Sequence, residues 1–236
     1  MAAGQLQGRS GAEGAGVTVV LLPPLDQTCA HFDAVLALLP DVDVLPVERP
    51  RLRRGAVAVR GLVDDLADLE EGVRGRAGPL VLLGASYGGL IARTFAGRRP
   101  HRVRGLVLVD AVHEDVYDGV AAAVGEQAGE VLANGEGLDL VVALRQARRL
   151  VAEAPLDDVP VVALARDRLH DDERAVHPEV DTLDRVWREH QERLGGCSRR
   201  ARLQVVAGAG HLIALEAPQE VAAAVREVAL TPRAAC

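Results

Sequence analysis

The serine at position 86 stands in a setting that can turn its hydroxyl into a nucleophile. It is the centre of the pentapeptide 84–88, Gly-Ala-Ser-Tyr-Gly, which follows the apolar run Leu80–Leu83 and precedes a helix-like stretch. A strand that turns sharply into a helix strains the central residue, and small residues two before and two after it let strand and helix close around it. Gly84 and Gly88 meet that requirement. The pattern predicts a nucleophile elbow at Ser86.

Among the seven histidines of the chain, His211 has the placement that best suits a general base. A serine hydroxyl is a weak nucleophile at neutral pH, so it needs a base within hydrogen-bond reach, and histidine best matches the working pH. His211 ends the stretch Gly-Ala-Gly-His directly after the apolar run Leu203–Ala207. The glycines let the imidazole project toward the carboxyl edge of a sheet. His211 is therefore the predicted base.

The predicted base needs a carboxylate that fixes its tautomer and stabilises the imidazolium formed during proton transfer. Asp167 follows the apolar run Val159–Ala165 and gives the chain order serine, acid, histidine. Asp110 ends another apolar run and is the alternative acid. Asp171, Asp172 or the lack of any acid are further alternatives. We expect Asp167 to be the acid.

These candidate residues must be positioned by a layered fold. Near-continuous hydrophobicity, rather than strict alternation, is typical of strands that helices cover on both faces, and such sheets are mainly parallel. The sequence predicts an α/β domain with a mainly parallel central sheet of about six strands and helices on both faces. The strands are expected in six apolar runs, Val17–Leu22, Val42–Val47, Leu80–Leu83, Gly105–Asp110, Val159–Ala165 and Leu203–Ala207.

Helical spacing of apolar residues predicts crossover helices within Val57–Arg74 and Gln219–Leu230. The segment 112–156 has helical pattern but no convincing strand, and it is too long for a plain connection. We expect it to form a small helical cap within a domain that spans 17–236. Residues 1–16 are rich in Gly, Ala and polar residues and are expected to be a disordered leader.

Composition narrows the classes of partner. The 236 residues carry a formal charge of -7 with no long basic stripe, which argues against a nucleic-acid partner. No apolar run suits a signal peptide or a membrane span, so a cytoplasmic location is expected. The three cysteines are widely spaced and lack C-x-x-C pairing, which indicates neither a disulfide framework nor a metal site. A small-molecule substrate is the expected partner, and the sequence leaves the oligomeric state open.

The chain resembles the α/β-hydrolase superfamily, in particular its bacterial esterase-like members. The similarity runs from about Val17 to Leu230 and is closest in 80–115, around the elbow, and in 208–228, around Gly-His. The resemblance implies the α/β-hydrolase fold and cofactor-independent acyl transfer on esters, thioesters, lactones or amides. Ser86 and His211 match the family's nucleophile and base, whereas Asp167 matches the acid by position only.

Two departures from the family pattern concern the substrate site. The family's oxyanion donors would be the N–H of Tyr87, just after the nucleophile, and that of Leu25. Here Pro24 replaces the glycine that usually precedes the second donor, and its fixed φ and missing N–H put the geometry of that loop in doubt. An arginine-rich stretch, with Arg51 and Arg53, replaces a glycine-rich turn, and these two side chains are candidate ligands for a phosphate or carboxylate on the substrate.

The leading interpretation is a serine hydrolase that cleaves a carboxylic ester or thioester of a small to medium acyl substrate through an acyl-enzyme. One alternative uses the same residues for cyclisation, acyl transfer to another acceptor, or lyase chemistry. A second alternative, from a different functional class, is a non-catalytic member that binds an apolar ligand.

Overall fold

A single parallel sheet organises the chain. The computed structural model describes residues 16–49, 60–125, 128, 138–169 and 179–231. In this part of the chain the sheet has six strands in the order β2-β1-β3-β4-β5-β6, and every neighbouring pair is parallel. The strands are β1 (Thr18–Leu22), β2 (Asp43–Pro46), β3 (Leu80–Ala85), β4 (Val103–Val109), β5 (Val161–Arg166) and β6 (Ala201–Val206). The predicted fold class and all six predicted strands are confirmed.

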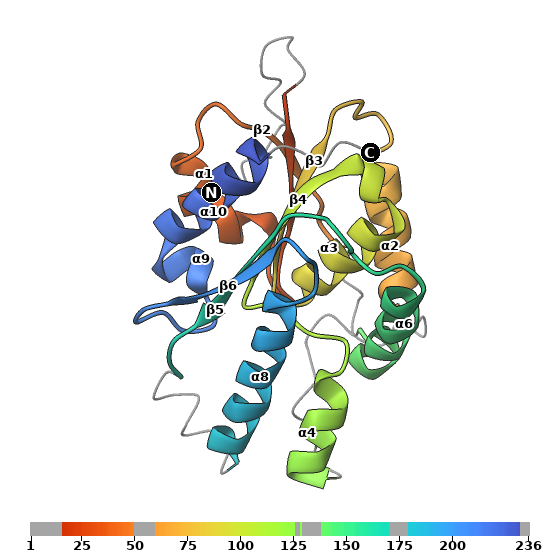
Figure 1. Cartoon of the computed structure of the whole chain (residues 1–236), viewed down its shortest axis with the longest axis vertical. Coiled ribbons are helices and arrows are strands. Elements are labelled where there is room, and N and C mark those ends of the chain that lie inside the picture. Colours follow the sequence, from red (N-terminus) through yellow and green to blue (C-terminus); the bar gives the residue numbers. More distant parts are fainter. Residues whose placement is uncertain (1–15, 50–59, 126–127, 129–137, 170–178, 232–236) are drawn as a thin grey trace, which may run out of the picture.

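Helices cover both faces of this sheet (Figure 1). One face carries α2 (Leu62–Gly72), α3 (Tyr87–Arg98) and α6 (Leu140–Glu153), and the other carries α1 (Asp33–Ala37), α9 (Ile213–Glu216) and α10 (Pro218–Leu230). Short 3-10 turns, η1 (Cys29–Phe32) and η2 (Pro100–Arg102), lead into α1 and β4. The strands β1, β3 and β5 are buried along their whole length, which explains their unbroken apolar runs, whereas the edge strands β2 and β6 are partly exposed.

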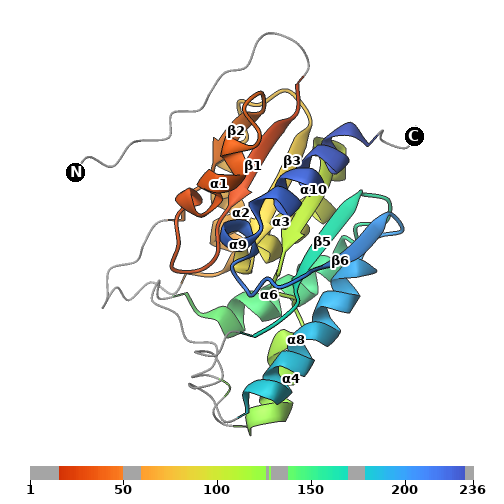
Figure 2. The same ribbon diagram turned by 90° about the vertical axis from the view of Figure 1, so that its left-hand side faces the viewer.

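Two helices extend beyond the carboxyl edge of the sheet (Figure 2). They are α4 (Val116–Val124), which follows β4, and α8 (Val180–Gly195), which joins β5 to β6, and they contact each other. Sequence reasoning did not identify α8. The helix α6, which also belongs to the expected cap segment, packs on α2 and α3. The structure describes only 112–125, 128 and 138–156 of that segment, so the cap stays a prediction, and residues 1–15 of the expected leader lie outside the described residues.

A buried polar cluster lies under α4 and α8. His113 is 5% exposed, its Nδ1 accepts a hydrogen bond from the Asp115 amide at 3.1 Å, and its ring centroid lies 5.1 Å from that of His190. Beside it, the buried side chains of Arg93 and Glu114 form an ion pair. Burial, together with the positive charge of Arg93, lowers the pKa of His113 to about 3. The imidazole is therefore neutral in the folded protein at all moderate pH values.

This burial predicts acid sensitivity. Below pH 6.5 the unfolded chain protonates His113, whereas the folded protein does not until the pH approaches about 3. The free energy of unfolding therefore keeps the whole contribution of His113 above pH 6.5 and loses it as the pH falls toward about 3. At pH 5 the loss from this residue is about 2 kcal/mol. His113→Asn keeps an acceptor for Asp115 and should lose less unfolding free energy between pH 7.5 and 5 in urea titrations. An equal loss in both proteins would contradict the prediction.

Candidate functional site

Ser86 occupies a strained turn between β3 and α3. Its backbone has φ 50° and ψ −120°, a left-handed conformation that costs energy for any residue other than glycine. Three hydrogen bonds hold the turn in place: the Ser86 N–H donates to the Val109 carbonyl, and the Ser86 carbonyl accepts from Gly89 and Val112, each at 3.0 Å. A strained backbone conformation that hydrogen bonds from the surroundings maintain is typical of functional sites. The predicted elbow geometry is present.

The glycines on either side of Ser86 permit close backbone contact. A Cβ on Gly84 would lie 2.5 Å from the Gly88 carbonyl oxygen, and one on Gly88 would lie 2.0 Å from the Leu22 carbonyl oxygen. Neither distance is possible for a real Cβ. The elbow therefore packs directly against the end of β1, the strand next to β3. This contact brings the loop after β1 beside the serine.

His211 is paired with Asp110. Its Nδ1 lies 2.6 Å from Oδ2 of Asp110, whose side chain is fully buried, whereas the imidazole is 30% exposed. The other carboxylate oxygen accepts a hydrogen bond from the Arg166 amide at 3.2 Å. A carboxylate can only accept here, so Nδ1 carries the proton and Nε2 keeps its lone pair. The Trp187 ring meets the imidazole edge to face, with centroids 5.6 Å apart. The pair thus has the orientation that a general base requires.

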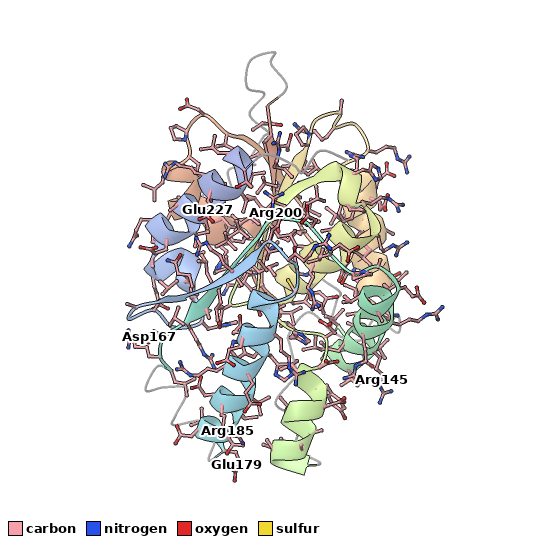
Figure 3. All side chains as sticks on the ribbon, in the orientation of Figure 1. Arg145, Asp167, Glu179, Arg185, Arg200 and Glu227 are labelled. Atoms are coloured by element: carbon pink, nitrogen blue, oxygen red, sulfur yellow. The ribbon has the colours of Figure 1, made fainter. Side chains whose placement is uncertain are left out.

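The expected acid, Asp167, lies elsewhere. Its Oδ2 accepts from the Gly208 amide at 2.9 Å, its own N–H donates to the Ala209 carbonyl, and its side chain is exposed on the surface (Figure 3). Asp167 therefore joins the loops after β5 and β6 and does not meet His211. The reason is local: at Asp110 the chain turns with φ 39°, and this turn directs the carboxylate toward the histidine loop. Asp171 and Asp172 lie outside the described residues.

Two backbone amides, one in the elbow and one in the loop after β1, are available as donors. Within the described part of the chain, neither the Tyr87 N–H, at the start of α3, nor the Leu25 N–H, in the loop after β1, has a hydrogen-bond acceptor. The helix dipole adds positive potential at Tyr87. In place of the glycine-based loop, the carbonyls of Pro23 and Pro24 are bound by Arg49. Sequence reasoning grouped Arg49 with the arginines that could bind an anionic substrate group, and it did not identify these backbone contacts.

The predicted anion ligands Arg51 and Arg53 lie outside the described residues, so their role stays a prediction. Among the described residues, no group of three or more His, Cys, Asp or Glu side chains is arranged to hold a metal ion. Over the same residues, no helix combines the length and the apolar character needed to cross a membrane.

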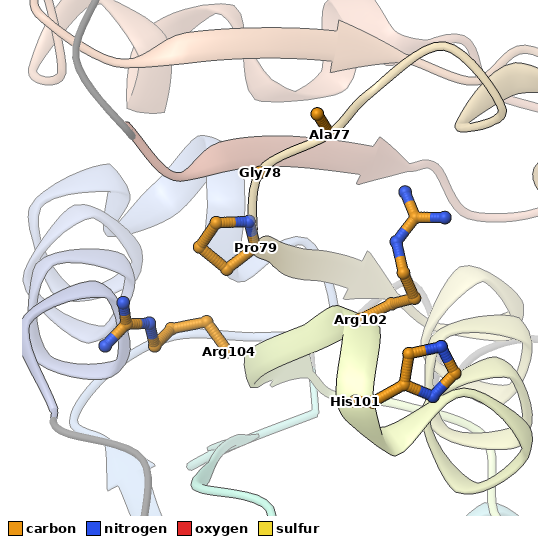
Figure 4. Close-up of a pocket in the computed structure, with 6 residues that line it drawn as sticks. All are labelled: Ala77, Gly78, Pro79, His101, Arg102 and Arg104. Atoms are coloured by element: carbon orange, nitrogen blue, oxygen red, sulfur yellow. The ribbon is translucent and has the colours of Figure 1, made fainter.

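A cavity of about 290 Å³ lies at the opposite edge of the sheet, where β3 and β4 begin. Its basic side chains point apart (Figure 4): Arg102 donates to the carbonyls of Val73 and Arg76, and Arg104 donates to that of Thr231. The other lining residues are Ala77, Gly78, Pro79 and His101. The guanidinium groups do not converge on a common point, and this cavity is separate from the Ser86 site.

Buried polar side chains hold the Tyr87 side chain in place. It is fully buried, and its hydroxyl donates to Oδ2 of Asp65 at 2.7 Å, while Arg60 donates to Oδ1 of the same carboxylate at 2.8 Å. Burial raises the pKa of Asp65, and the hydrogen bonds from Tyr87 and Arg60 oppose that rise. The side chain next to the nucleophile is thus fixed by a buried polar network.

Comparisons with known proteins agree with this geometry. The sequence model described as "Alpha/beta hydrolase family" matches residues 19–224. NosK from Streptomyces actuosus is 26% identical, with 90% of this chain and 97% of that chain covered and a TM-score of 0.55. A thermophilic esterase from Thermogutta terrifontis, solved with malate bound, is 21% identical over 91% of this chain and 89% of that one, with a TM-score of 0.57.

The NocB thioesterase domain of the nocardicin cluster is 23% identical, with 90% of this chain and 93% of that chain covered and a TM-score of 0.54. A comparison with curated proteins finds no match. At such identities the esterase and the thioesterase show a shared fold.

The network behind Tyr87 predicts a stability effect. Tyr87→Phe removes one of the partners of the buried Asp65 carboxylate and should lower the free energy of unfolding by about 1.5 to 3 kcal/mol, as measured in urea. Tyr117→Phe is the matched control, because within the described residues the Tyr117 hydroxyl has no hydrogen-bond partner. That variant should stay within about 0.5 kcal/mol of wild type. Equal stabilities for the two variants would show that the Asp65 contact contributes nothing.

Proposed function

The chain belongs to the α/β-hydrolase family, and on that premise we propose that it is a serine hydrolase acting on carboxylic esters or thioesters of small to medium acyl groups. The observation that carries the proposal is the bond of 2.6 Å between His211 and the buried Asp110, at the sheet edge where Ser86 is held in its strained turn. Esterases and a thioesterase among proteins of the same fold support the substrate class. The proposal keeps the cytoplasmic location and the cofactor-free chemistry expected from the sequence.

The proposed reaction proceeds through an acyl-enzyme. Nε2 of His211 accepts the hydroxyl proton as Oγ of Ser86 attacks the carbonyl carbon, and Asp110 stabilises the imidazolium that forms. The amides of Tyr87 and Leu25 donate to the oxyanion of the tetrahedral intermediate. The imidazolium then gives its proton to the departing alcohol or thiol. Water, activated by the same imidazole, adds to the acyl-enzyme and releases the acid and the free serine.

A small to medium acyl group is part of the proposal because the segment after β4 carries many apolar residues. Val116 and Val120 of α4 and Val186 of α8 are buried where these two helices meet beyond the carboxyl edge of the sheet. These side chains pack in the core, so the proposed size of the acyl group rests on the apolar character of the segment 112–156. The arginines Arg51 and Arg53 remain our proposed contacts for a charged group, such as the phosphate of a phosphopantetheine thioester.

The proposal is tested by turnover and by product analysis. Ser86→Ala should lower the hydrolysis rate of p-nitrophenyl butyrate by about 10⁶-fold, because the nucleophile, base and acid act as a unit. In ¹⁸O-labelled water the acid product should gain one labelled oxygen. An unlabelled cyclised or transferred product would instead favour the cyclase, acyltransferase or lyase alternative. Wild-type turnover in Ser86→Ala would refute the proposal, and a folded, inactive wild type would favour the non-catalytic member.

The identity of the acid has its own test. Asp110→Asn should lower kcat by about 10⁴-fold, because the amide can leave the imidazole in the wrong tautomer. Asp167→Asn changes an exposed carboxylate whose one hydrogen bond among the described residues comes from the loop amide of Gly208, so this variant should keep kcat within about threefold of wild type. Steady-state kinetics of the two matched variants decide the assignment. The opposite order of effects would restore Asp167 as the acid.

A further inference from the structure

The guanidinium group of Arg49 contacts both Tyr87, which carries one proposed oxyanion donor, and the prolines just before Leu25, which carries the other. Arg49 follows β2, and its Nη1 donates to the Pro23 carbonyl at 2.6 Å while its Nη2 donates to the Pro24 carbonyl at 2.5 Å. Its Cζ also lies 5.5 Å from the centre of the Tyr87 ring, within the range of a cation–π contact. One side chain thus touches both the loop after β1 and the residue after the nucleophile.

The contact with Pro24 fixes the direction of the Leu25 amide. The carbonyl of Pro24 and the N–H of Leu25 belong to one peptide plane, and in a trans peptide they point in opposite directions. The described part of the chain has no cis peptide bond. Because Arg49 holds the carbonyl on its own side, the Leu25 N–H must point away from Arg49. That amide has no acceptor among the described residues, as a donor reserved for a ligand would require.

The loop needs such an anchor because its prolines provide few hydrogen bonds of their own. Pro23 and Pro24 are buried and lack N–H groups, so without Arg49 their buried carbonyls would lose their partners. Glu48, the residue before Arg49, binds the other end of the same loop, because its Oε1 accepts a hydrogen bond from the Cys29 amide at 2.8 Å. Two adjacent side chains at the end of β2 therefore hold both ends of the loop.

We propose that Arg49 is the positioning residue of the oxyanion hole, taking over the role that loop glycines have elsewhere in the family. The inference rests on the proposed function, since it concerns the donors of that reaction. Arg49 acts through the backbone: it orients the Leu25 amide by holding Pro24 and keeps the loop against Tyr87. Its effect should therefore appear in the transition state, where charge develops on the substrate oxygen, and not in substrate binding.

The test compares Arg49→Gln with Arg102→Gln, using p-nitrophenyl butyrate. Arg102 is a matched control because it also donates to two backbone carbonyls, but at the opposite edge of the sheet. Arg49→Gln should lower kcat by about 10- to 100-fold, less than the loss of a whole donor, with KM within about threefold. Arg49→Lys, which keeps the charge and one donor, should fall between wild type and Arg49→Gln. Arg102→Gln should keep kcat within about twofold.

Inhibition by a trifluoromethyl ketone provides a readout that a purely structural role would not move. This probe forms a tetrahedral oxyanion on Ser86, so its Ki should rise in Arg49→Gln by the same factor as kcat/KM falls, while the Ki of butyrate stays unchanged. A rise in KM at constant kcat, or equal kinetics in Arg49→Gln and Arg102→Gln, would overturn the inference. If Arg49→Gln does not fold, Arg49→Lys decides by the same comparison.

The two proposals fail in different ways. If Ser86→Ala turns over like wild type, both fall, because no oxyanion forms on that serine. If Ser86→Ala is inactive while both Arg49 variants match wild type in kcat and in trifluoromethyl ketone Ki, the serine hydrolase stands and only the role of Arg49 is wrong.

Discussion

The backbone turn at Ser86 is the constraint on which the rest of the site depends. A non-glycine residue with φ 50° persists only where its surroundings hold it, and here the neighbouring strand end and the following loop do so through Val109 and Val112. The turn also places the first amide of α3 beside the hydroxyl. The same turn requires glycine at positions 84 and 88, because the strand, the helix and the end of β1 approach too closely for a Cβ.

Parallel strands explain how distant segments reach this turn. The carboxyl ends of β1, β3, β4, β5 and β6 share one edge of the sheet, so the loops that follow them lie side by side. Asp110 leaves β4 and His211 follows β6, and their hydrogen bond spans β5, whose last residue, Arg166, donates its amide to the same carboxylate. Asp110 is thus held by the strand between the two partners, and its carboxylate is fully buried.

The parts of the fold that depend on local pattern could be predicted from the sequence. The six strands, the elbow at Ser86 and the position of His211 after the last strand follow from apolar runs and glycine placement. The choice between Asp110 and Asp167 could not be made, because both follow strands and only the turn at Asp110 directs its carboxylate to the histidine. The hydrogen bond from Arg49 to the Pro24 carbonyl could not be predicted either, because it joins residues 25 positions apart in the sequence.

The proposed reaction requires that His211 activates Ser86 as a nucleophile. Intact-mass spectrometry after reaction with a fluorophosphonate at pH 7.5 measures this activation. We expect one adduct on the wild-type protein and none on Ser86→Ala or His211→Ala. His101→Ala, which changes an imidazole at the opposite edge of the sheet, should react like wild type. A folded wild-type protein that takes up no label, or an adduct that persists in Ser86→Ala, would contradict the account.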